Sequence, residues 1–516
     1  MNDHDGYTKE QFLEWVAVGG TSGDEYFAVT QEVAFPEVDP VPIYRALVGD
    51  RIGHLFETVN AKAGHGWGIG MEPYAVIDFD GECFHVEHRN SRKKYQVLSQ
   101  MVIPRLRWLV SQYSPVNGEH AAGRAFGNIS FEFAYLLDKF QIAESPFSPS
   151  SFPMAYLQFC RINLAYSAQR QTLKVSVVVP HSDVAGKGRD SAIVILEEAL
   201  QQIQHVVQLA VNASQTASVD EIPCDAAVIP GLPSLTCSRD AYLQNVMRAQ
   251  EHIAAGDIFQ VVLSMKARRH TVARPIDIFW AMKRLNPSPY MYYLNSGKTQ
   301  ILGTSPEMLV SQLGRKIRVN PIAGTIARGT SEAQDNEFVS VLLGSEKDRA
   351  EHVMLVDLGR NDVGKVANIR SVTVDDYMRV EKYSHVIHLV SSVSGELKGG
   401  KDCFDAFAAT FPAGTVSGAP KIRAMEIIHE LEGSPRGPYA GAICAFDFNG
   451  DMDSCIAIRS IFMDGSHATL QAGAGIVMDS SPTAEYDECI NKLKVAARAI
   501  EMAEAAIADT YCAEVA

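Results

Sequence analysis

The sequence has no Cys-x-x-Cys pair, because its nine cysteines are scattered between positions 83 and 512. This spacing excludes a cysteine zinc site and a disulfide framework, and it predicts reduced thiols in a cytoplasmic protein. No run approaches the roughly 18 consecutive apolar residues of a membrane span, and the polar N-terminus lacks the apolar core of a secretory signal. Positive charge is scarce, with 46 Lys and Arg against 61 Asp and Glu and a net charge of −15. We therefore expect neither nucleic acid nor an anionic membrane as a partner.

Apolar residues are plentiful by contrast. The chain has 516 residues, 47% of them hydrophobic, which is enough for a large core and at least two structural units. The segment 213–237 is rich in Ser, Thr and Pro, and we expect it to separate an N-terminal α+β region, residues 1–225, from a second region, residues 238–512. In the second region, runs of strands alternate with helices predicted near 331–358, 402–410, 420–432 and 484–507. This order predicts an α+β fold, with large antiparallel β-sheets covered by helices on the outside.

The helix predicted at 482–507 carries charges on an unexpected side. Successive helical residues are about 100° apart, which places Glu485, Glu488 and Lys492 beside the apolar stripe. The opposite face, which we expect in solvent, holds Asp487, Asn491, Lys494, Arg498 and Glu501. A buried carboxylate is costly unless it is paired or bound to a metal. Two interpretations follow: a boundary salt bridge from one glutamate to Lys492, or a site that faces a cleft.

A second helix, 345–362, repeats this pattern. Glu351 shares a face with apolar residues, namely Met354, Leu355 and Leu358. One inward carboxylate is usually structural, but two sets from distant helices favour a shared Mg²⁺ site. Magnesium prefers one or two carboxylates together with water and an anionic substrate.

Two segments near the C-terminus are suited to binding an anion. Arg459 lies in the otherwise apolar predicted strand SCIAIRSIFM, where it needs a carboxylate or phosphate partner. A structural ion pair and a ligand clamp explain this arginine equally well. Gly473, Ala474 and Gly475, which follow a predicted strand, allow backbone N–H groups to approach an anion, although a plain bend explains them too.

A series of colinear blocks between residues 240 and 500 resembles a known family. The blocks are PYMYYL, GTSPE, PIAGT, KDRAEHVMLVDLGRNDVGKV, EKYSHVIHLVSSV, FPAGTVSGAPKIRAMEII, RGPYAGAI, CIAIRS, GAGIV and AEYDECINK. Together they resemble the chorismate-utilising enzymes, and more closely component I of anthranilate synthase. The resemblance implies antiparallel sheets packed as a sandwich with helices outside. The first 230 residues match far more loosely.

The resemblance implies chorismate as the substrate and Mg²⁺ as the cofactor. The metal would hold the ring carboxylate of chorismate. The implied metal-binding residues are Glu351 and Glu488, with Glu485 beside them. The implied substrate-binding residues are Tyr439, Arg459, Gly473, Ala474, Gly475 and Lys492.

The resemblance also implies a reaction in two steps, in which ammonia displaces the C4 hydroxyl by adding at C2 and pyruvate is then eliminated to give anthranilate. Glu307 matches the general acid that protonates the hydroxyl, a role that needs a pKa raised toward neutrality. His388 matches the histidine linked to elimination, and Thr415 matches a residue that lines the ring. Gln260 and Ala323 stand where some relatives carry a lysine that activates water or forms a covalent amine. Both differences favour direct attack by ammonia.

No cysteine lies in the Gly-x-Cys-x-Gly setting of a glutaminase. The resemblance therefore implies that ammonia comes from a separate glutamine amidotransferase subunit, in a hetero-oligomer. Two alternatives stay open. The first is a 2-amino-2-deoxyisochorismate synthase that stops after amination, against which His388 argues. The second is an inactive scaffold for a glutaminase, which the retained inward charges disfavour because they cost stability.

A tryptophan feedback site is a further feature of the family. Its NPSPYM motif is intact at 286–291, but its LLES motif reads LFET at 55–58. The residues implied in tryptophan binding are Glu57, Thr58, Pro289, Tyr290 and Met291. Threonine still offers a hydroxyl, so the sequence leaves feedback inhibition open.

Overall fold

The computed structural model describes residues 4–18, 25–60, 64–89, 91–118, 121–142, 150–216, 234–382 and 386–515. Hydrogen bonds join 22 strands of this part of the chain into one network. The network divides into two antiparallel sheets that share a ribbon of two long strands, β3 (Gly64–Phe79) and β7 (Ala155–Ser167). The predicted α+β fold with large antiparallel sheets is thus confirmed.

The β3–β7 ribbon belongs to a different sheet at each of its ends. At one end, β2 (Gly53–Asn60) pairs with β3 and β8 (Thr172–Pro180) pairs with β7. At the other end, β4 (Cys83–His88) pairs with β3 and β6 (Arg124–Ile129) pairs with β7. Between the two ends, the register of β3 shifts between Pro73 and Ala75. A shift of this kind bends a strand and lets it pass from one sheet to another.

The first sheet ends at the strands that carry part of the predicted site. Its order is β1 (Tyr26–Ala34), β8, β7, β3, β2, β11 (Tyr290–Asn295), β12 (Thr299–Ser305), β21 (Ser460–Asp464), β22 (His467–Ile476) and β10 (Gln260–His270). Two short strands, β9 (Ser234–Leu235) and β18 (Gly418–Ala419), also pair with β10.

The second sheet runs from the N-terminal region to the strand that carries His388. Its order is β5 (Ser91–Gln96), β4, β3, β7, β6, β19 (Ala442–Asp447), β20 (Met452–Ile456), β13 (Met308–Leu313), β14 (Lys316–Val319) and β17 (Val386–Glu396). Strands β15 (Ile322–Ala327) and β16 (Thr373–Lys382) also pair with β17.

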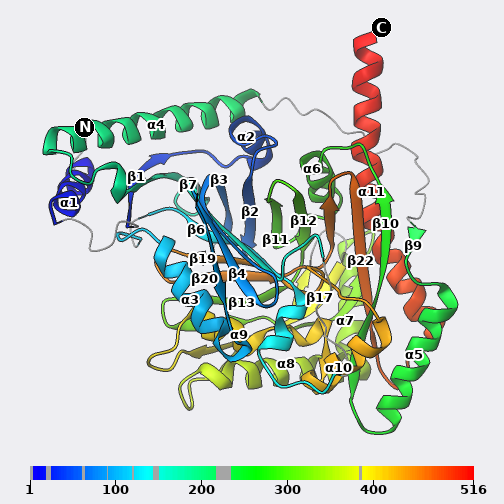
Figure 1. Ribbon diagram of the computed structural model, residues 1–516. Coiled ribbons are helices and arrows are strands. Elements are labelled where there is room, and N and C mark those ends of the chain that lie inside the picture. Colours follow the sequence, from blue (N-terminus) through cyan, green and yellow to red (C-terminus); the bar gives the residue numbers. More distant parts are fainter. Residues whose placement is uncertain are drawn as a thin grey trace.

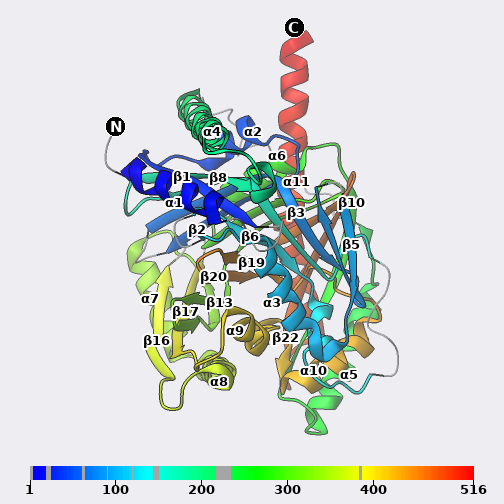
Figure 2. The same ribbon diagram turned by 60° about the vertical axis from the view of Figure 1, so that its left-hand side comes forward.

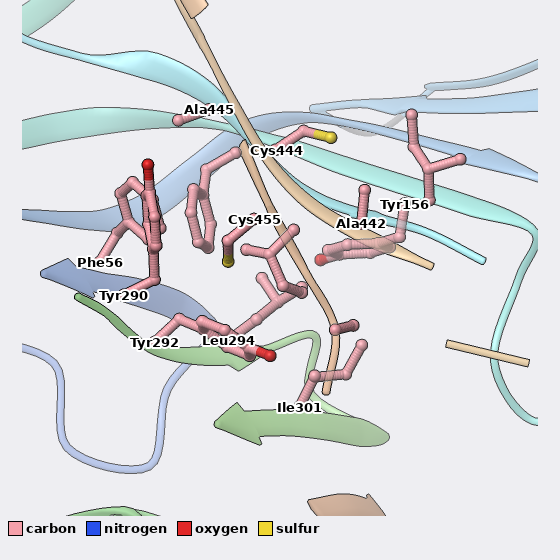
Figure 3. Packing of buried hydrophobic residues seen from close by; sticks show 14 of the residues in the cluster. Phe56, Tyr156, Tyr290, Tyr292, Leu294, Ile301, Ala442, Cys444, Ala445 and Cys455 are labelled. Atoms are coloured by element: carbon pink, nitrogen blue, oxygen red, sulfur yellow. The ribbon is translucent and has the colours of Figure 1, made fainter. Parts of the chain in front are cut away.

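The main core lies between the two sheets. Figure 3 shows aromatic and aliphatic side chains of the first sheet packed against small and sulfur-containing side chains of the second. The labelled residues of β2, β11 and β12 are Phe56, Tyr290, Tyr292, Leu294 and Ile301, and those of β19 and β20 are Ala442, Cys444, Ala445 and Cys455. The hydroxyl of Tyr290 also donates a hydrogen bond across the core to Asp453 of β20, at 3.0 Å. This packing confirms the predicted sandwich.

The chain crosses between the sheets twice near the predicted site. Pro306 and Glu307 join β12 of the first sheet to β13 of the second, and residues 457–459 join β20 back to β21. The crossings are hydrogen-bonded to their neighbours, with Ile456 N–H donating to Glu307 C=O and Thr304 N–H to Arg459 C=O, both at 3.1 Å. The prediction of one continuous strand through Arg459 is wrong, because the chain changes sheets there and Arg459 has a positive φ of 51°.

Helices cover the outside of the sandwich (Figure 1). They are α1 (His4–Val18), α2 (Pro40–Leu47), α3 (Val102–Tyr113), α4 (Arg189–Thr216), α5 (Arg239–Ala254), α6 (Pro275–Leu285), α7 (Glu332–Gly344), α8 (Glu346–Val366), α9 (Cys403–Thr410), α10 (Lys421–Glu432) and α11 (Pro482–Val515). Four 3₁₀ turns accompany them: η1 (Ser99–Met101), η2 (Phe131–Leu136), η3 (His181–Asp183) and η4 (Gly414–Val416). None of the helices described is long and apolar enough to cross a membrane.

Three helices position the predicted site. Helix α8 packs on β15 and β17, α10 packs on β10, and α11 packs on β22. The single helix predicted near 331–358 is two helices, because Ser345 caps α8 by accepting a hydrogen bond from Asp348 N–H at 3.2 Å. The C-terminal end of α11 projects beyond the rest of the chain in both views (Figures 1 and 2).

The boundary predicted between residues 225 and 238 stays a prediction, since residues 217–233 lie outside the described part of the chain. Strands from the two sides of this segment do pair with each other, β2 with β11 and β6 with β19. Both sheets therefore contain strands from both predicted regions. The seven cysteines whose side chains the structure describes are free, as expected from their spacing.

Candidate active site

A cavity of about 680 Å³ lies between the outer strands of the two sheets, with α8 and α11 along its sides. Every residue predicted to act in catalysis, substrate binding or metal binding lines it, apart from Ala474. The lining predicted residues are Gln260, Glu307, Glu351, His388, Thr415, Tyr439, Arg459, Gly473, Gly475, Glu485, Glu488 and Lys492. Ala474 alternates to the other side of β22, where it is buried.

Glu307 lies at the first crossing between the sheets and faces the cavity. Burial raises the pKa of its carboxyl to about 7, although a hydrogen bond from Thr415 opposes the shift. The hydroxyl of Thr415 donates this bond to Oε1 of Glu307 at 2.7 Å. A carboxyl with a pKa near neutrality retains a proton that it can give to a leaving group. The property expected of the general acid is therefore present at Glu307.

His388 faces the cavity from β17. Burial lowers the pKa of its imidazole, while a hydrogen bond to the carbonyl of Gly324 partly opposes this effect. Nδ1 donates that bond at 3.3 Å, since a carbonyl oxygen only accepts. In the neutral ring, the lone pair then lies on Nε2. The side chain is thus prepared to take up a proton near pH 7.

The charges of α11 that border its apolar stripe face the cavity, as the helical geometry predicted. Lys492 Nζ donates to Glu488 Oε1 at 2.6 Å and to the carbonyl of Gly473 at 2.8 Å. The predicted boundary salt bridge and the predicted cleft are therefore both present. Glu501 was expected in solvent, but this prediction is wrong: its side chain is buried and pairs with Arg269 of β10 at 3.0 Å.

Three carboxylates, those of Glu351, Glu485 and Glu488, reach one cavity from two helices. The described part of the chain contains no group of three or more His, Cys, Asp and Glu side chains placed to hold a metal by themselves. Magnesium does not require such a cage, because it takes one or two carboxylates and completes its shell with water and substrate oxygens. Hard oxygen donors on the wall of an open cavity fit this ion.

Arg459 and Tyr439 line the cavity together with the small residues Gly473 and Gly475. Burial lowers the pKa of the Arg459 guanidinium, while Tyr439 and then Glu488 oppose the shift. Gly473 and Gly475 lie inside β22, which pairs with β10 without a register shift, so the alternative of a plain bend does not hold. A Cβ at Gly473 would lie 3.0 Å from Tyr439 Oη, and one at Gly475 would lie 2.7 Å from Gln260 Nε2. Glycine is therefore needed here for close packing around the cavity.

Comparison with known proteins identifies the family. The family model of the chorismate binding enzymes matches residues 58–498. The chain belongs to this family. Within it, the chain is 36% identical over 480 residues to anthranilate synthase component 1 of Acetivibrio thermocellus, covering 92% of this chain and 95% of that protein. It is 41% identical over 485 residues to anthranilate synthase component 1 of Streptomyces coelicolor, with 92% and 89% covered.

Solved structures agree with this assignment. Anthranilate synthase component I from Streptococcus pneumoniae TIGR4 superposes with a TM-score of 0.65 at 28% identity, covering 85% of this chain and 93% of that one. MenF, the menaquinone-specific isochorismate synthase from Escherichia coli, shares the fold with a TM-score of 0.66 at 18% identity, covering 96% and 99%. The resemblance noted in the sequence to the chorismate-utilising enzymes, and to anthranilate synthase component I among them, is confirmed.

The sequence patterns missed a buried polar network behind this cavity of the chorismate binding enzyme. Arg436 lies behind the wall with its side chain paired to Glu432 of α10. Glu432 in turn accepts hydrogen bonds from the N–H and hydroxyl of Ser264, at 2.8 and 2.9 Å. Glu132, from the N-terminal region, accepts the N–H of Arg436 at 2.6 Å. The available signals were the arginine that opens RGPYAGAI and the lone acid among the aromatic residues of FEFAY.

The residues predicted to bind tryptophan are brought together elsewhere, on the paired strands β2 and β11. Thr58 is opposite Tyr290, and Glu57 is opposite Met291. Thr58, Pro289 and Tyr290 line a separate cavity of about 940 Å³. Glu57 is instead fully buried, and its Oε2 accepts hydrogen bonds from Lys283 at 2.8 Å and from His65 at 3.1 Å. Tryptophan binding at this second cavity stays a prediction.

Proposed function

We propose that this chain is the chorismate-converting component of an anthranilate synthase, which forms anthranilate and pyruvate from chorismate and ammonia. The observation that carries the proposal is the pairing of two proton-transfer groups in one cavity. Glu307 has a pKa raised to about 7, and His388 is neutral at that pH because burial lowers its pKa. The curated relatives that match most of the chain carry the name anthranilate synthase component 1.

In the first step, ammonia forms a bond to C2 of chorismate, both ring double bonds shift by one position, and the C4–O bond breaks. Glu307 gives its proton to the departing hydroxyl, which leaves as water, and the new ammonium group loses a proton to solvent. Gln260 and Ala323, which both line the cavity, have no amine that competes with ammonia as a nucleophile or activates water for attack. The chain therefore favours amination over hydration.

In the second step, a proton leaves C2 and the bond from the ring to the enolpyruvyl oxygen breaks. The ring becomes aromatic, and the enol takes up a proton to become pyruvate. We assign the proton transfer of this step to His388, because its lowered pKa keeps the imidazole neutral near pH 7. Thr415 lies beside Glu307 and lines the same ring site.

Two sets of residues would hold the two carboxylates of chorismate. Arg459 and Tyr439, together with the backbone at 473–475, would bind the carboxylate of the enolpyruvyl group, since arginine forms paired hydrogen bonds with a carboxylate. Glu351 and Glu488, with Glu485 beside them, would hold Mg²⁺ against the other, and Lys492 would approach this side. Bound Mg²⁺ would stabilise the negative charge of the substrate electrostatically.

Ammonia would come from a separate glutamine amidotransferase subunit in a hetero-oligomer. The name component 1 of the relatives agrees with a second component. Alone, this chain should use ammonium salts and fail with glutamine. Addition of a matching glutaminase subunit should restore glutamine-dependent turnover.

Product identification tests the proposal. Purified chain is incubated with chorismate, Mg²⁺ and an ammonium salt at mildly alkaline pH, and both fluorescence and pyruvate are recorded. Anthranilate fluorescence with an equal amount of pyruvate is the expected result. An aminated, nonfluorescent product that keeps its enolpyruvyl group would instead indicate a synthase that stops after amination. Absence of turnover with a folded chain would favour the inactive scaffold.

One variant separates the two steps. His388→Asn keeps a polar side chain of similar size but removes the titrating ring, so amination should continue while pyruvate release falls. The aminated intermediate should then accumulate, which liquid chromatography with mass detection would show. Equal loss of amination and elimination would contradict the assignment of His388 to the second step.

A further inference from the structure

Arg436 is a buried arginine that holds two strips of the cavity wall from behind. The whole residue is 4% exposed, and its side chain is 1% exposed. Nη1 donates to the carbonyl of Val416, and Nη2 donates to the carbonyl of Val262, both at 2.7 Å. Val262 and Val416 both line the cavity of about 680 Å³. Arg436 itself does not line it, so any action on the substrate must pass through these residues.

The guanidinium is itself held on every side. Glu432 accepts from Nε at 2.9 Å and from Nη2 at 2.6 Å, a paired arrangement that fixes the plane of the guanidinium. The guanidinium carbon lies 4.5 Å from the ring centre of Phe131 and 5.9 Å from that of Tyr439, which lines the cavity. The position of Arg436 is therefore fixed by α10, by η2 and by the cavity wall together.

The N-terminal region fixes the backbone of Arg436 as well. Glu132 of η2 accepts the N–H of Arg436 at 2.6 Å and the N–H of Gly437 at 3.0 Å, each with a different carboxylate oxygen. This contact spans 304 residues of sequence. The N-terminal region, which matches the family more loosely in sequence, thus directly supports the residues behind the cavity wall.

A buried ion pair of this kind is weak evidence for a role in stability, because desolvation offsets most of its attraction. Its geometry instead points to the turn η4. Val416 ends this turn, and the residue before it is Thr415, whose hydroxyl reaches Glu307 at 2.7 Å. A carbonyl clamped at Val416 fixes the orientation of the adjacent threonine.

We propose that Arg436 is a positioning residue that holds the 414–416 turn so that Thr415 keeps its hydrogen bond to Glu307. This inference rests on the proposed function, in which Glu307 is the general acid. Arg436 has no contact with the substrate in this role. It acts through the carbonyl of Val416.

The proposal has a consequence for pH dependence. The bond from Thr415 favours the charged carboxylate and so lowers the pKa of Glu307, against the larger effect of burial. Loss of this bond must raise that pKa further. Glu307 acts while protonated, so activity is present below its pKa and is lost as pH rises through it. The alkaline limb of the pH profile must therefore move to higher pH when Thr415 is displaced.

Other titratable groups share a cavity with Glu307. The acidic ones are Asp348, Glu351, Asp362, Asp479, Glu485 and Glu488. The basic ones are His388, Arg459 and Lys492. The Arg436 and Thr415 substitutions below leave all of them in place, together with Glu132, whose pKa burial also raises to about 7, so a moved limb in these variants reports on Glu307 and its own hydrogen bond.

The experiment is a double-mutant cycle of Arg436→Lys and Thr415→Val, read as kcat/KM for chorismate against pH at a constant concentration of free ammonia. Lysine keeps the charge but lacks the planar fork that reaches Val262, Val416 and Glu432 together. Each single variant should move the alkaline limb upward. The double variant should show the same limb as Thr415→Val alone, because both changes break the same link. We expect kcat to fall about 10- to 100-fold in Arg436→Lys.

An alkaline limb of Arg436→Lys that coincides with that of the unmodified chain would overturn the proposal, even if turnover or melting temperature falls. Additive shifts in the double variant would do the same. Arg360→Lys, an exposed arginine of α8 paired with Asp357, makes the same chemical change away from the cavity and should leave the limb in place.

Should Arg436→Lys fail to fold, Glu132→Gln decides, measured alone and in the Thr415→Val background, because Glu132 itself has a pKa raised to about 7 and a shift that passes through Thr415 must disappear in that background. The amide keeps one acceptor for the backbone of 436–437 and replaces the other with a donor, so the limb should move upward by a smaller amount. An unmoved limb in this variant overturns the proposal. Failure of the proposed function is distinguishable from these outcomes, because the unmodified chain would then release no anthranilate at any pH.

Discussion

Two regions of this chorismate binding enzyme bury carboxylates in different ways. In the catalytic cavity, Glu307 accepts a hydrogen bond from the hydroxyl of Thr415. It has no ion pair with any basic side chain that the structure describes, and burial raises its pKa to about 7. In the N-terminal region, Glu57 is fully buried but pairs with Lys283 at 2.8 Å. Burial without a cation raises the pKa of Glu307, which suits a proton donor, whereas the ion pair with Lys283 ties Glu57 to the fold.

The same contrast runs along α11. Glu488 is exposed at the cavity, with 51% of its side chain accessible, while Glu501 further along is buried against Arg269. One helix thus carries a glutamate that can meet a ligand and a glutamate that anchors the helix to β10. Three predictions test this contrast between buried and exposed carboxylates, and a fourth tests the environment of His388 in the same cavity.

The largest effect is expected for Glu307→Gln. The amide keeps the shape and the hydrogen bond from Thr415 but has no proton to donate, so kcat should fall about 10²- to 10⁴-fold. Stability should hold, because no ion pair is broken. Anthranilate fluorescence and thermal melting measure the two effects. Glu430→Gln, which alters an exposed pair with Arg248, is the matched control and should change neither. Turnover within tenfold of the unmodified chain would contradict the general-acid role.

The next effect is expected for Glu488→Ala. If Glu488 holds the metal as proposed, its loss should reduce Mg²⁺-dependent turnover roughly 100-fold or more, since bound metal supplies several kcal/mol of charge stabilisation. The fold should survive because the side chain is half-exposed. Activity is titrated with Mg²⁺, and folding is followed by circular dichroism. Glu198→Ala, which removes an exposed carboxylate of α4 away from the cavity, serves as control. Full turnover in Glu488→Ala would remove this residue from the metal site.

Lys283→Met should show the reverse pattern. It leaves Glu57 buried without its ammonium partner, which should lower the free energy of unfolding by about 3 kcal/mol. The product and its ratio to pyruvate should stay unchanged, because Lys283 lies outside the catalytic cavity. Urea denaturation measures the loss, with the exposed Lys298→Met as a matched control. A variant as stable as the unmodified chain would show that Glu57 is not held by this pair.

The smallest effect concerns the acid limb of pyruvate release. His388 must be neutral to take a proton, so this step is lost as pH falls through the pKa of the imidazole. Burial lowers that pKa below its ordinary value of about 6.5. Pyruvate formed per aminated intermediate should therefore be flat between pH 7 and 8 and decline only below about 6.5. A decline that begins above pH 7 would contradict the environment described for His388.

Much of the candidate site followed from the sequence. Helical geometry placed Glu351, Glu485, Glu488 and Lys492 toward one side, and the cavity contains all four. The colinear blocks identified the family and supplied Glu307 and His388 as the candidates for proton transfer. These features are local, because a helix has a fixed period and a motif has a fixed spacing.

Other features depended on contacts that no local pattern contains. Glu501 was predicted in solvent because its own helix places it opposite the apolar stripe, but Arg269 of β10 covers it. Arg459 was predicted inside a strand because its neighbours are apolar, yet the chain changes sheets at that residue. Glu132 contacts Arg436 and Gly437 across about 300 residues of sequence, and although each segment carries a conspicuous charged residue, neither segment shows which partner the other supplies.

By itself, the sequence of this enzyme determined the family, the side of α8 and α11 that meets the cavity and the identity of most cavity residues, since each rests on neighbours within a few turns or on a fixed motif. Only the tertiary structure decided which buried carboxylate has a cation partner and which keeps a proton. Burial and pairing depend on strands and helices far apart in the chain, and the free energy of a charge depends on what surrounds it in space. The contrast between Glu307 and Glu57 is therefore a property of the fold.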